Sequence, residues 1–171
     1  GPVAEEQELT LKYKTSYWDE IPDWAKDDDG DWIVGYYGTI SIMSNDANVP
    51  EAPTSFQDLL DGDYNVCIGD VTAAAVAQYA VLAAANALGG SIDDMQPGYD
   101  FLQQLAEAGR LDVSDASLAR IESGEIDVCV NWDYNALNYR AQILENNPNA
   151  SFSVNIPTDA YIRSGYCTII N

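Results

Sequence analysis

The sequence NVCIGDVT at residues 65–72 indicates a short buried strand that turns directly into a helix. Residues 66–68 are apolar and too few for a buried helix, as in a strand inside a sheet. The Ala-rich sequence AAAVAQYAVLAAANAL follows at residues 73–88, and two glycines at 89–90 end it as glycines commonly end helices. A strand that leads straight into a helix is typical of α/β proteins, in which helices cover both faces of a largely parallel sheet.

The same alternation of strand and helix continues on both sides of this unit. Predicted strands lie at 32–43, 65–68, 126–131, 151–155 and 161–170, and predicted helices at 54–60, 73–88, 94–108, 114–124 and 135–145. The expected fold class is α/β, a three-layer lobe with a mostly parallel mixed sheet flanked by helices. The 171 residues suffice for one such core. We divide the chain into a polar segment, residues 1–31, and a lobe, residues 32–171.

Two predicted helices begin at residues that commonly cap helices. The sequence TSFQ at residues 54–57 fits a capping box, with Thr54 as the N-cap and Gln57 three residues later. Ser114 is expected to cap the helix that contains Leu118 and Ile121.

The chain is strongly acidic, with 28 Asp and Glu residues, 7 Lys and Arg residues and a net charge of −21. Binding to phosphates of nucleic acids requires basic patches, so the composition excludes nucleic acid as a partner. The charge indicates either a solvated surface or a preference for a cationic ligand. No histidine occurs, which removes His-based catalytic triads and histidine zinc sites. We expect no cofactor and no bound metal.

Three cysteines, Cys67, Cys129 and Cys167, each lie inside an apolar, strand-like run. An odd number without short spacing argues against a disulfide framework or a zinc site. Buried free thiols are therefore expected. A bridge between Cys67 and Cys129 stays open if their strands are neighbours.

Ligands of open α/β sheets gather beyond the carboxyl ends of the strands. One turn at such a place consists of Asp70, Val71 and Thr72 and leads into the helix at 73–88. Free backbone N–H groups at a helix start attract an anion or the polar edge of a ligand, and the Thr72 hydroxyl adds a hydrogen bond. The alternative is that Asp70 or Thr72 only caps the helix.

A second turn of this kind consists of Asn131, Trp132, Asp133 and Tyr134. A tryptophan at the tip of a strand is hard to bury in the sheet, and it could stack on a ligand or hold an amine by cation–π attraction. Asp133 offers a carboxylate and Tyr134 a phenol. The alternative is that Trp132 packs on the next helix and Asp133 caps it. Tyr166, near the last strand, is a third candidate, which points either into the same crevice or into the core.

Four segments follow one another in a specific order: PTSFQDLL at 53–60, LGG at 88–90, SGEIDV at 123–128, and IPTDA at 156–160 continuing to the Gly-Tyr pair at 165–166. In this order they resemble the P-x-[ST]-[WF]-x-D-L helix, the usual helix end, the SGE-[IV]-D strand entry and the P-x-[DE]-G…GY segment of bacterial solute-binding proteins. The members meant have type II lobes and belong to the iron, polyamine and thiamine branches. Ala160 replaces the usual glycine, and the likeness covers residues 32–171.

The resemblance implies one lobe of a two-lobed extracellular protein. Such a protein closes on a small solute between its lobes and delivers it to the membrane permease of an ABC importer. Residues 32–171 would form the second lobe, in which the strands at 32–43 and 161–170 would be the crossover strands near the hinge. Residues 1–31 would be a remnant of the first lobe or a linker, and the missing first lobe of the same chain would be a partner. The resemblance implies an extracellular location, as a cell-surface lipoprotein or in the periplasm, and no enzymatic activity.

The ligand stays open between three classes of solute. Polyamine members carry a tryptophan close to Trp132 with acidic groups nearby, which suits Asp133, although Tyr166 stands where they use an acidic residue. Ferric-iron members place two adjacent tyrosines after this strand, and Tyr134 matches the first while Asn135 departs from the second. Phosphonate and sugar-phosphate members use the helix start after residue 72. We lean towards a polyamine-like or other cationic solute.

Two function classes outside this family also stay open. An enzyme could use Asp70 and Asp133 as acid and base across the crevice, and burial that raises the pKa of one of them would be the sign. A surface protein-interaction domain would show an exposed apolar patch.

Overall fold

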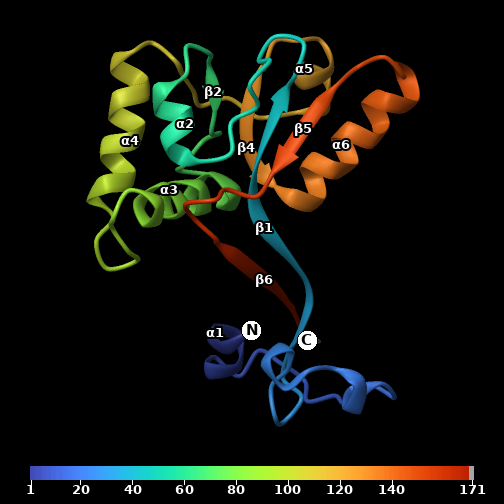
Figure 1. The fold of residues 1–171 in the computed structure, drawn as a ribbon. Coiled ribbons are helices and arrows are strands. Elements are labelled where there is room, and N and C mark those ends of the chain that lie inside the picture. Colours follow the sequence, from blue (N-terminus) through green and yellow to red (C-terminus); the bar gives the residue numbers. More distant parts are fainter. Residues whose placement is uncertain (170–171) are drawn as a thin grey trace. The chain divides into compact units, whose positions relative to one another are not determined.

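The computed structural model describes residues 1–169, and Figure 1 shows its elements. The helices are α1 (Pro2–Glu6), α2 (Phe56–Asp61), α3 (Ala75–Ala87), α4 (Gln96–Glu107), α5 (Leu118–Glu122) and α6 (Asp133–Asn146), and the strands are β1 (Ile33–Asn45), β2 (Val66–Cys67), β3 (Leu111–Asp112), β4 (Val128–Trp132), β5 (Phe152–Asn155) and β6 (Arg163–Thr168). Every helix and strand predicted from the sequence is present, and the end of the last predicted strand, residue 170, lies outside the described residues. No helix in the described part is long and apolar enough to cross a membrane.

The sheet is mixed, and most of its strands point the same way. The order is β3-β2-β4-β1-β5, with β6 pairing to β1 off this path. β2 is parallel to β3 and to β4, whereas β1 is antiparallel to both β4 and β5. Consequently β2, β3, β4 and β5 share one direction and β1 runs against them, which confirms the expected mostly parallel mixed sheet.

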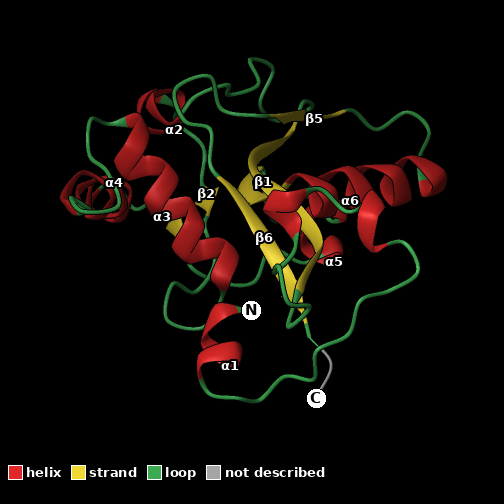
Figure 2. Ribbon diagram, turned by 90° about the horizontal axis from the view of Figure 1, so that it is seen from below, coloured by secondary structure: helices red, strands yellow, loops and turns green. Residues whose placement is uncertain are grey.

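Helices cover both faces of this sheet within residues 39–162. Figures 1 and 2 show α2, α3 and α4 on one side and α5 and α6 on the other. All five residues of the central strand β4 are buried. On the α6 side, Cys67 and Cys129 belong to one core cluster with Met43 and with Ile143 of α6. The predicted three-layer architecture is therefore confirmed.

Small residues set the close approach of α3 and α4. Most of the buried face of α3 is alanine, and a Cβ added at Gly98 of α4 would meet the carbonyl oxygen of Val81 and lie 3.1 Å from the Cβ of Ala85. Phe101 and Leu105 follow on the same face of α4 and are fully buried. The two helices thus pack backbone against backbone at Gly98 and through large side chains further along.

The N-terminus of α2 carries a capping arrangement one residue later than predicted. Ser55 is the N-cap, and its Oγ accepts a hydrogen bond from the backbone N of Asp58 at 3.0 Å. Asp58 Oδ2 in turn accepts one from the backbone N of Thr54 at 2.8 Å. The assignment of Thr54 as the N-cap with Gln57 as its partner is wrong, because the neighbouring pair Ser55 and Asp58 satisfies these donors.

A distant carboxylate also caps α2. Asp159 accepts hydrogen bonds from the backbone N of Phe56, at 2.9 and 3.1 Å to its two oxygens, and from the backbone N of Gln57 at 3.3 Å. Thr158 donates from its backbone N to the carbonyl oxygen of Thr54 at 2.8 Å. The sequence segments 53–60 and 156–160, which resemble separate family motifs, are therefore parts of one hydrogen-bonded assembly.

The predicted cap of α5 is displaced as well. α5 begins at Leu118 with Ser117 as its N-cap and without a side-chain cap bond. Ser114 lies in the preceding turn, where its backbone N donates to Asp112 Oδ1 at 2.8 Å and its carbonyl oxygen accepts a bond from Cys67 Sγ at 3.2 Å. Ser114 thus closes the turn after β3 rather than starting the helix.

The chain divides into two compact units, residues 39–162 and residues 1–38 together with the described residues from 163 onward. In the latter unit Tyr36 stacks on Tyr166 with ring centroids 4.7 Å apart. The Arg163 guanidinium lies 4.7 Å from the ring centroid of Tyr37 and 5.5 Å from that of Trp24. The division at residue 31 that we expect from the sequence stays a prediction about the lobes.

The unit of residues 39–162 begins and ends at adjacent points. The backbone N of Ile40 donates a hydrogen bond to the carbonyl oxygen of Ile162 at 2.9 Å. Its first and last residues are therefore neighbours in space.

Candidate functional site

Two strand-to-helix turns meet at the carboxyl ends of β2 and β4. These strands are parallel neighbours, with Val66 opposite Val128 and Cys67 opposite Cys129. The turn after β2 leads to α3, and β4 runs directly into α6. Because parallel neighbours end at the same edge, the sheet brings together the turns at 70–72 and 131–134, as the sequence predicts.

The first turn is closed by Asp70. Its Oδ1 accepts hydrogen bonds from the Thr72 backbone N at 2.8 Å and from Thr72 Oγ1 at 2.6 Å, and these bonds lower the pKa of the exposed Asp70 carboxyl group. Gly69 has φ +85°, a conformation that glycine adopts without strain. The turn therefore leaves β2 sharply and fixes Asp70 at its edge.

α3 starts after this turn rather than within it. Its N-cap is Ala74, which offers no side-chain bond. The simple capping role for Asp70 or Thr72 is therefore wrong, since their bonds lie inside the preceding turn. The first N–H groups of a helix lack intrahelical partners, and a role for the start of α3 in binding a ligand stays a prediction.

The second turn points neighbouring residues to opposite faces of the sheet, because side chains alternate along a strand. Asn131 is buried, and its Oδ1 accepts bonds from the Trp132 backbone N at 2.8 Å and from Asn135 Nδ2 at 3.4 Å. Asp133 Oδ1 accepts bonds from the backbone N of Thr39 at 3.0 Å and of Tyr134 at 2.9 Å. Asp133 therefore ties the start of α6 to β1.

Trp132 is the centre of an aromatic cluster. Its ring centroid lies 5.3 Å from that of Tyr79 on α3 and 6.4 Å from that of Tyr134, with which it is stacked. Trp132 is only 3% exposed, whereas Tyr134 is 37% exposed. The expectation that this tryptophan is hard to bury is wrong, because α3 supplies a tyrosine that covers it. In this arrangement Tyr134 is the most exposed member of the cluster.

A cavity of about 300 Å³ opens where the two turns meet. Its lining comes from the first turn and α3, from the loop before α5, and from β4 and α6. The lining residues are Ile68, Gly69, Asp70, Ala73, Ala74, Val76, Asp115, Ala116, Val130, Asn131, Asn135 and Tyr139. Two carboxylates, two amides and one phenol thus face a cavity that has no lysine or arginine among these lining residues.

The predicted residues fall into three groups. Asp70 and Asn131 line the cavity. Val71, Thr72, Trp132, Asp133 and Tyr134 belong to the same two turns but lie outside the lining. Tyr166 belongs to the other compact unit, where it stacks on Tyr36, and its role at the site stays a prediction.

Sequence reasoning missed Asp115, Asn135 and Tyr139 as parts of the site. Asn135 and Tyr139 are four residues apart on α6 and therefore share one face of that helix, which could have been noticed. Asp115 lies on the loop between β3 and α5, and no pattern in the sequence around it indicates a binding site.

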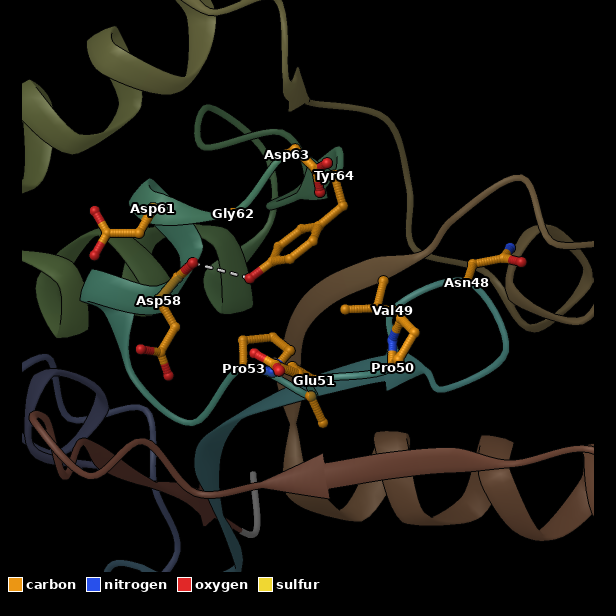
Figure 3. Close-up of a pocket in the computed structure, with 11 residues that line it drawn as sticks. Asn48, Val49, Pro50, Glu51, Pro53, Asp58, Asp61, Gly62, Asp63 and Tyr64 are labelled. Carbon is orange, nitrogen blue, oxygen red and sulfur yellow. Dashed lines mark hydrogen bonds between the residues drawn. The ribbon is translucent and has the colours of Figure 1, made fainter.

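A larger cavity, of about 610 Å³, lies at the other end of the sheet (Figure 3). Glu51, Asp58, Asp61 and Asp63 surround it, and Tyr64 donates a hydrogen bond from its hydroxyl to the carbonyl oxygen of Asp58 at 2.9 Å. Burial raises the pKa of Tyr64 to about 12. The cavity lies where β2 and β4 begin, not at the carboxyl ends where α/β proteins place their ligands.

Comparisons with known proteins add a family and a fold. A family model described as "Bacterial extracellular solute-binding protein" matches residues 3–171. No curated protein sequence matches the chain.

Solved structures share the fold at low identity. Iron-bound HitA from Pseudomonas aeruginosa is 16% identical, with a TM-score of 0.66 over 98% of this chain and 54% of HitA. AfuA from Actinobacillus pleuropneumoniae, with fructose-6-phosphate bound, is 18% identical, with a TM-score of 0.69 over 98% of this chain and 54% of AfuA. The spermidine/putrescine substrate-binding protein PotD from Streptococcus pneumoniae is 21% identical, with a TM-score of 0.66 over 98% and 53%. The chain spans about half the length of these proteins.

Proposed function

The chain belongs to the bacterial extracellular solute-binding proteins, and we propose that it forms one lobe of a two-lobed protein that delivers a small solute to the permease of an ABC importer. The proposed lobe is residues 32–171, with residues 1–31 as a remnant of the first lobe or a linker. The chain spans about half of HitA, AfuA and PotD, which supports the proposal of a single lobe. The proposed location is extracellular, on a lipid anchor or in the periplasm.

The observation that carries the proposal is the cavity at the carboxyl ends of β2 and β4. It combines a helix start without a side-chain cap, two carboxylates and two amides. A second lobe that closes over this edge would contact the same solute, and closure would be stabilised by the contacts that only the closed state makes. Such a cavity can bind and orient a solute without a chemical step.

The charge around the cavity favours a cationic solute, such as a polyamine. Asp70 and Asp115 line it, Asp133 lies in the adjacent turn, and the lining residues include no lysine or arginine. A carboxylate about 4 Å from an ammonium group contributes about 1 kcal/mol in water and about 4 kcal/mol at the effective dielectric near a protein surface. The exposed Tyr134 ring adds a surface for cation–π contact.

The two other ligand classes have weaker support. A phosphate group would gain from the start of α3 but would also face Asp70 and Asp115 without a compensating cation in the lining. Ferric iron would find phenols at Tyr134 and Tyr139, but Tyr139 is on the cavity side and Tyr134 is in the aromatic cluster.

A binding role is favoured over catalysis. Asp70, one of the two carboxylates considered for acid–base catalysis, has a lowered pKa, whereas a carboxyl group that acts as a general acid near neutral pH needs a raised one. A surface interaction domain is the other alternative. The feature that favours it is the exposed aromatic side chains of Trp24, Tyr36 and Tyr37 in the unit that contains residues 1–38.

A thermal-shift titration of the two-lobed protein that contains this lobe tests the proposal. The panel holds spermidine, putrescine, ferric iron, thiamine, a phosphonate and fructose-6-phosphate. A ligand at about 100 times its dissociation constant adds about 2.7 kcal/mol of stability. We expect a shift with spermidine or putrescine, and Asp70→Asn or Asp115→Asn should each weaken the affinity for this ligand about tenfold.

The control variant is Asp63→Asn, which removes an exposed carboxylate at the other end of the sheet. It should leave the affinity unchanged. A shift with iron or the phosphorylated sugar alone would replace the polyamine assignment. No shift with any member of the panel would count against solute binding and for an interaction domain.

A further inference from the structure

Cys67 and Cys129 are direct neighbours on parallel strands. They lie opposite each other in the register of β2 and β4. Each is 1% exposed, and both belong to the core cluster on the α6 side of the sheet. Both are free thiols in this structure, and Cys67 Sγ donates a hydrogen bond to the carbonyl oxygen of Ser114 at 3.2 Å.

The spacing of the strands suits a covalent link between these residues. Neighbouring strands lie about 4.7–4.9 Å apart, and the Cα atoms of a disulfide lie about 4.4–6.8 Å apart. Residues opposite each other in adjacent strands point their side chains to the same face. The Cβ atoms must approach to about 3.8 Å, closer than the strand spacing, so the link is strained and easily reduced.

We propose that Cys67 and Cys129 are an oxidation site, and that they form an intramolecular disulfide joining β2 to β4 when the chain folds in an oxidising extracellular environment. Secreted and periplasmic proteins meet such conditions. The inference goes beyond the proposed function, because it requires the extracellular family but no particular solute.

The chemistry is a thiol–disulfide exchange with a small-molecule disulfide such as oxidised glutathione. The thiolate of one cysteine attacks a sulfur of the reagent, which breaks the reagent's S–S bond and releases one glutathione thiolate. The thiolate of the second cysteine then attacks the mixed disulfide and releases the second glutathione thiolate. The two cysteines lose two electrons and two protons, and the reagent becomes two molecules of reduced glutathione.

The burial of the pair sets when this reaction occurs. Burial raises the pKa of Cys67 to about 11 and also raises that of Cys129. The thiolate is the reactive form, so the folded, reduced protein resists oxidation. The exchange therefore takes place during folding, before the core closes over the two thiols.

The link would act on the two turns of the candidate site. Cys67 is followed by Ile68, Gly69 and Asp70, and Cys129 is followed by Val130 and Asn131. A bond between the two cysteines fixes the separation of the strand ends from which both turns start. The oxidised protein should therefore hold the two turns more rigidly than the reduced protein.

Refolding of the whole chain in a glutathione buffer tests the proposal. The protein is unfolded with reductant, refolded with oxidised or with reduced glutathione, unfolded again in N-ethylmaleimide and analysed by mass spectrometry. We expect the oxidised sample to carry maleimide at Cys167 alone and to yield a peptide pair joined through Cys67 and Cys129. Maleimide on all three cysteines after oxidative refolding would overturn the proposal.

Three controls make the result specific. Cys167→Ser should leave the link intact, because Cys167 is exposed and lies in the other unit. Cys67→Ser and Cys129→Ser should each abolish the link. If either variant fails to fold, the presence or absence of the joined peptides in the wild-type protein decides whether the proposal holds. Hydrogen exchange at residues 69–74 and 131–133 should be slower in the linked form, and equal exchange in both forms would overturn the effect on the turns.

Discussion

Asp58 stabilises the first turn of α2 only while it is ionised. Its carboxylate accepts hydrogen bonds from the backbone N and the hydroxyl of Thr54, and the bond from the backbone N is the largest cause of its lowered pKa. The pKa in the folded state is therefore below the value of 3.8 for the free group. The stabilisation is complete above that value and is lost as the pH falls through the lower folded-state pKa.

We expect Asp58→Asn to destabilise the protein by about 1 kcal/mol at neutral pH. The difference from the wild type should narrow as the pH falls below 3.8, because protonated Asp58 also loses its charge. Urea denaturation at several pH values measures the two free energies of unfolding. A difference that stays constant with pH would show that the charge of Asp58 is not the cause.

At the scale of single elements, α2 depends on a residue that lies about a hundred positions away in the sequence. Asp159 accepts bonds from Phe56 and Gln57, and its negative charge is favourable at a helix N-terminus. We expect Asp159→Ala to lower the free energy of unfolding by about 1–2 kcal/mol, within the range for lost N-caps. Asp159→Asn, which keeps one acceptor oxygen, should have a smaller effect. Asp61→Ala at the other end of α2 is the control in the same urea experiment.

The close contact between α3 and α4 decides whether the substitution Gly98→Ala stabilises or destabilises the protein. Alanine is about 1 kcal/mol more favourable than glycine inside a helix, so Gly98→Ala would stabilise an isolated α4. In the protein the new Cβ meets the carbonyl oxygen of Val81, and overpacking of this kind costs about 1–3 kcal/mol. We therefore expect a net loss of stability in thermal denaturation. Gln104→Ala, on the exposed side of α4, is the control and should be nearly neutral.

The elements were predictable where the signal is local. The buried strand before residue 70, the Ala-rich helix after it and the closing glycines at 89–90 all follow from short-range patterns. Two candidate caps, Thr54 and Ser55, precede α2, and three, Ser114, Asp115 and Ser117, precede α5. Propensity does not choose between such neighbours, so both caps were misplaced. β3, only two residues long, gives no periodic signal.

The site was predictable in part, for the same reason. Asp70 and Asn131 were found because they follow strands, and strand ends are where ligands gather. Asp115 comes to the cavity through packing of another element, which no local pattern records, whereas the four-residue spacing of Asn135 and Tyr139 on α6 was a usable signal. The burial of Trp132 was missed because it depends on Tyr79, a residue of a different helix.

At the scale of the whole molecule, the net charge of −21 opposes compact folding. Salt shortens the reach of this repulsion, from about 30 Å at about 0.01 M to about 8 Å at about 0.15 M. We expect the melting temperature to rise over this range, by about 2–4 °C for each kcal/mol gained. Sodium chloride and choline chloride should give equal shifts if screening is the cause. A larger shift with sodium would indicate specific binding of the ion instead.

The hydrogen bond between Ile40 and Ile162 bears on whether residues 39–162 can be moved into another protein. A stretch of chain whose two ends lie close together is suited to domain insertion, because it can be placed in a tight surface turn of an unrelated protein without separating the residues on either side of that turn. Residues 39–162 meet this condition. Gene insertion, or a protein engineer, could transplant this stretch with its cavity through two short junctions.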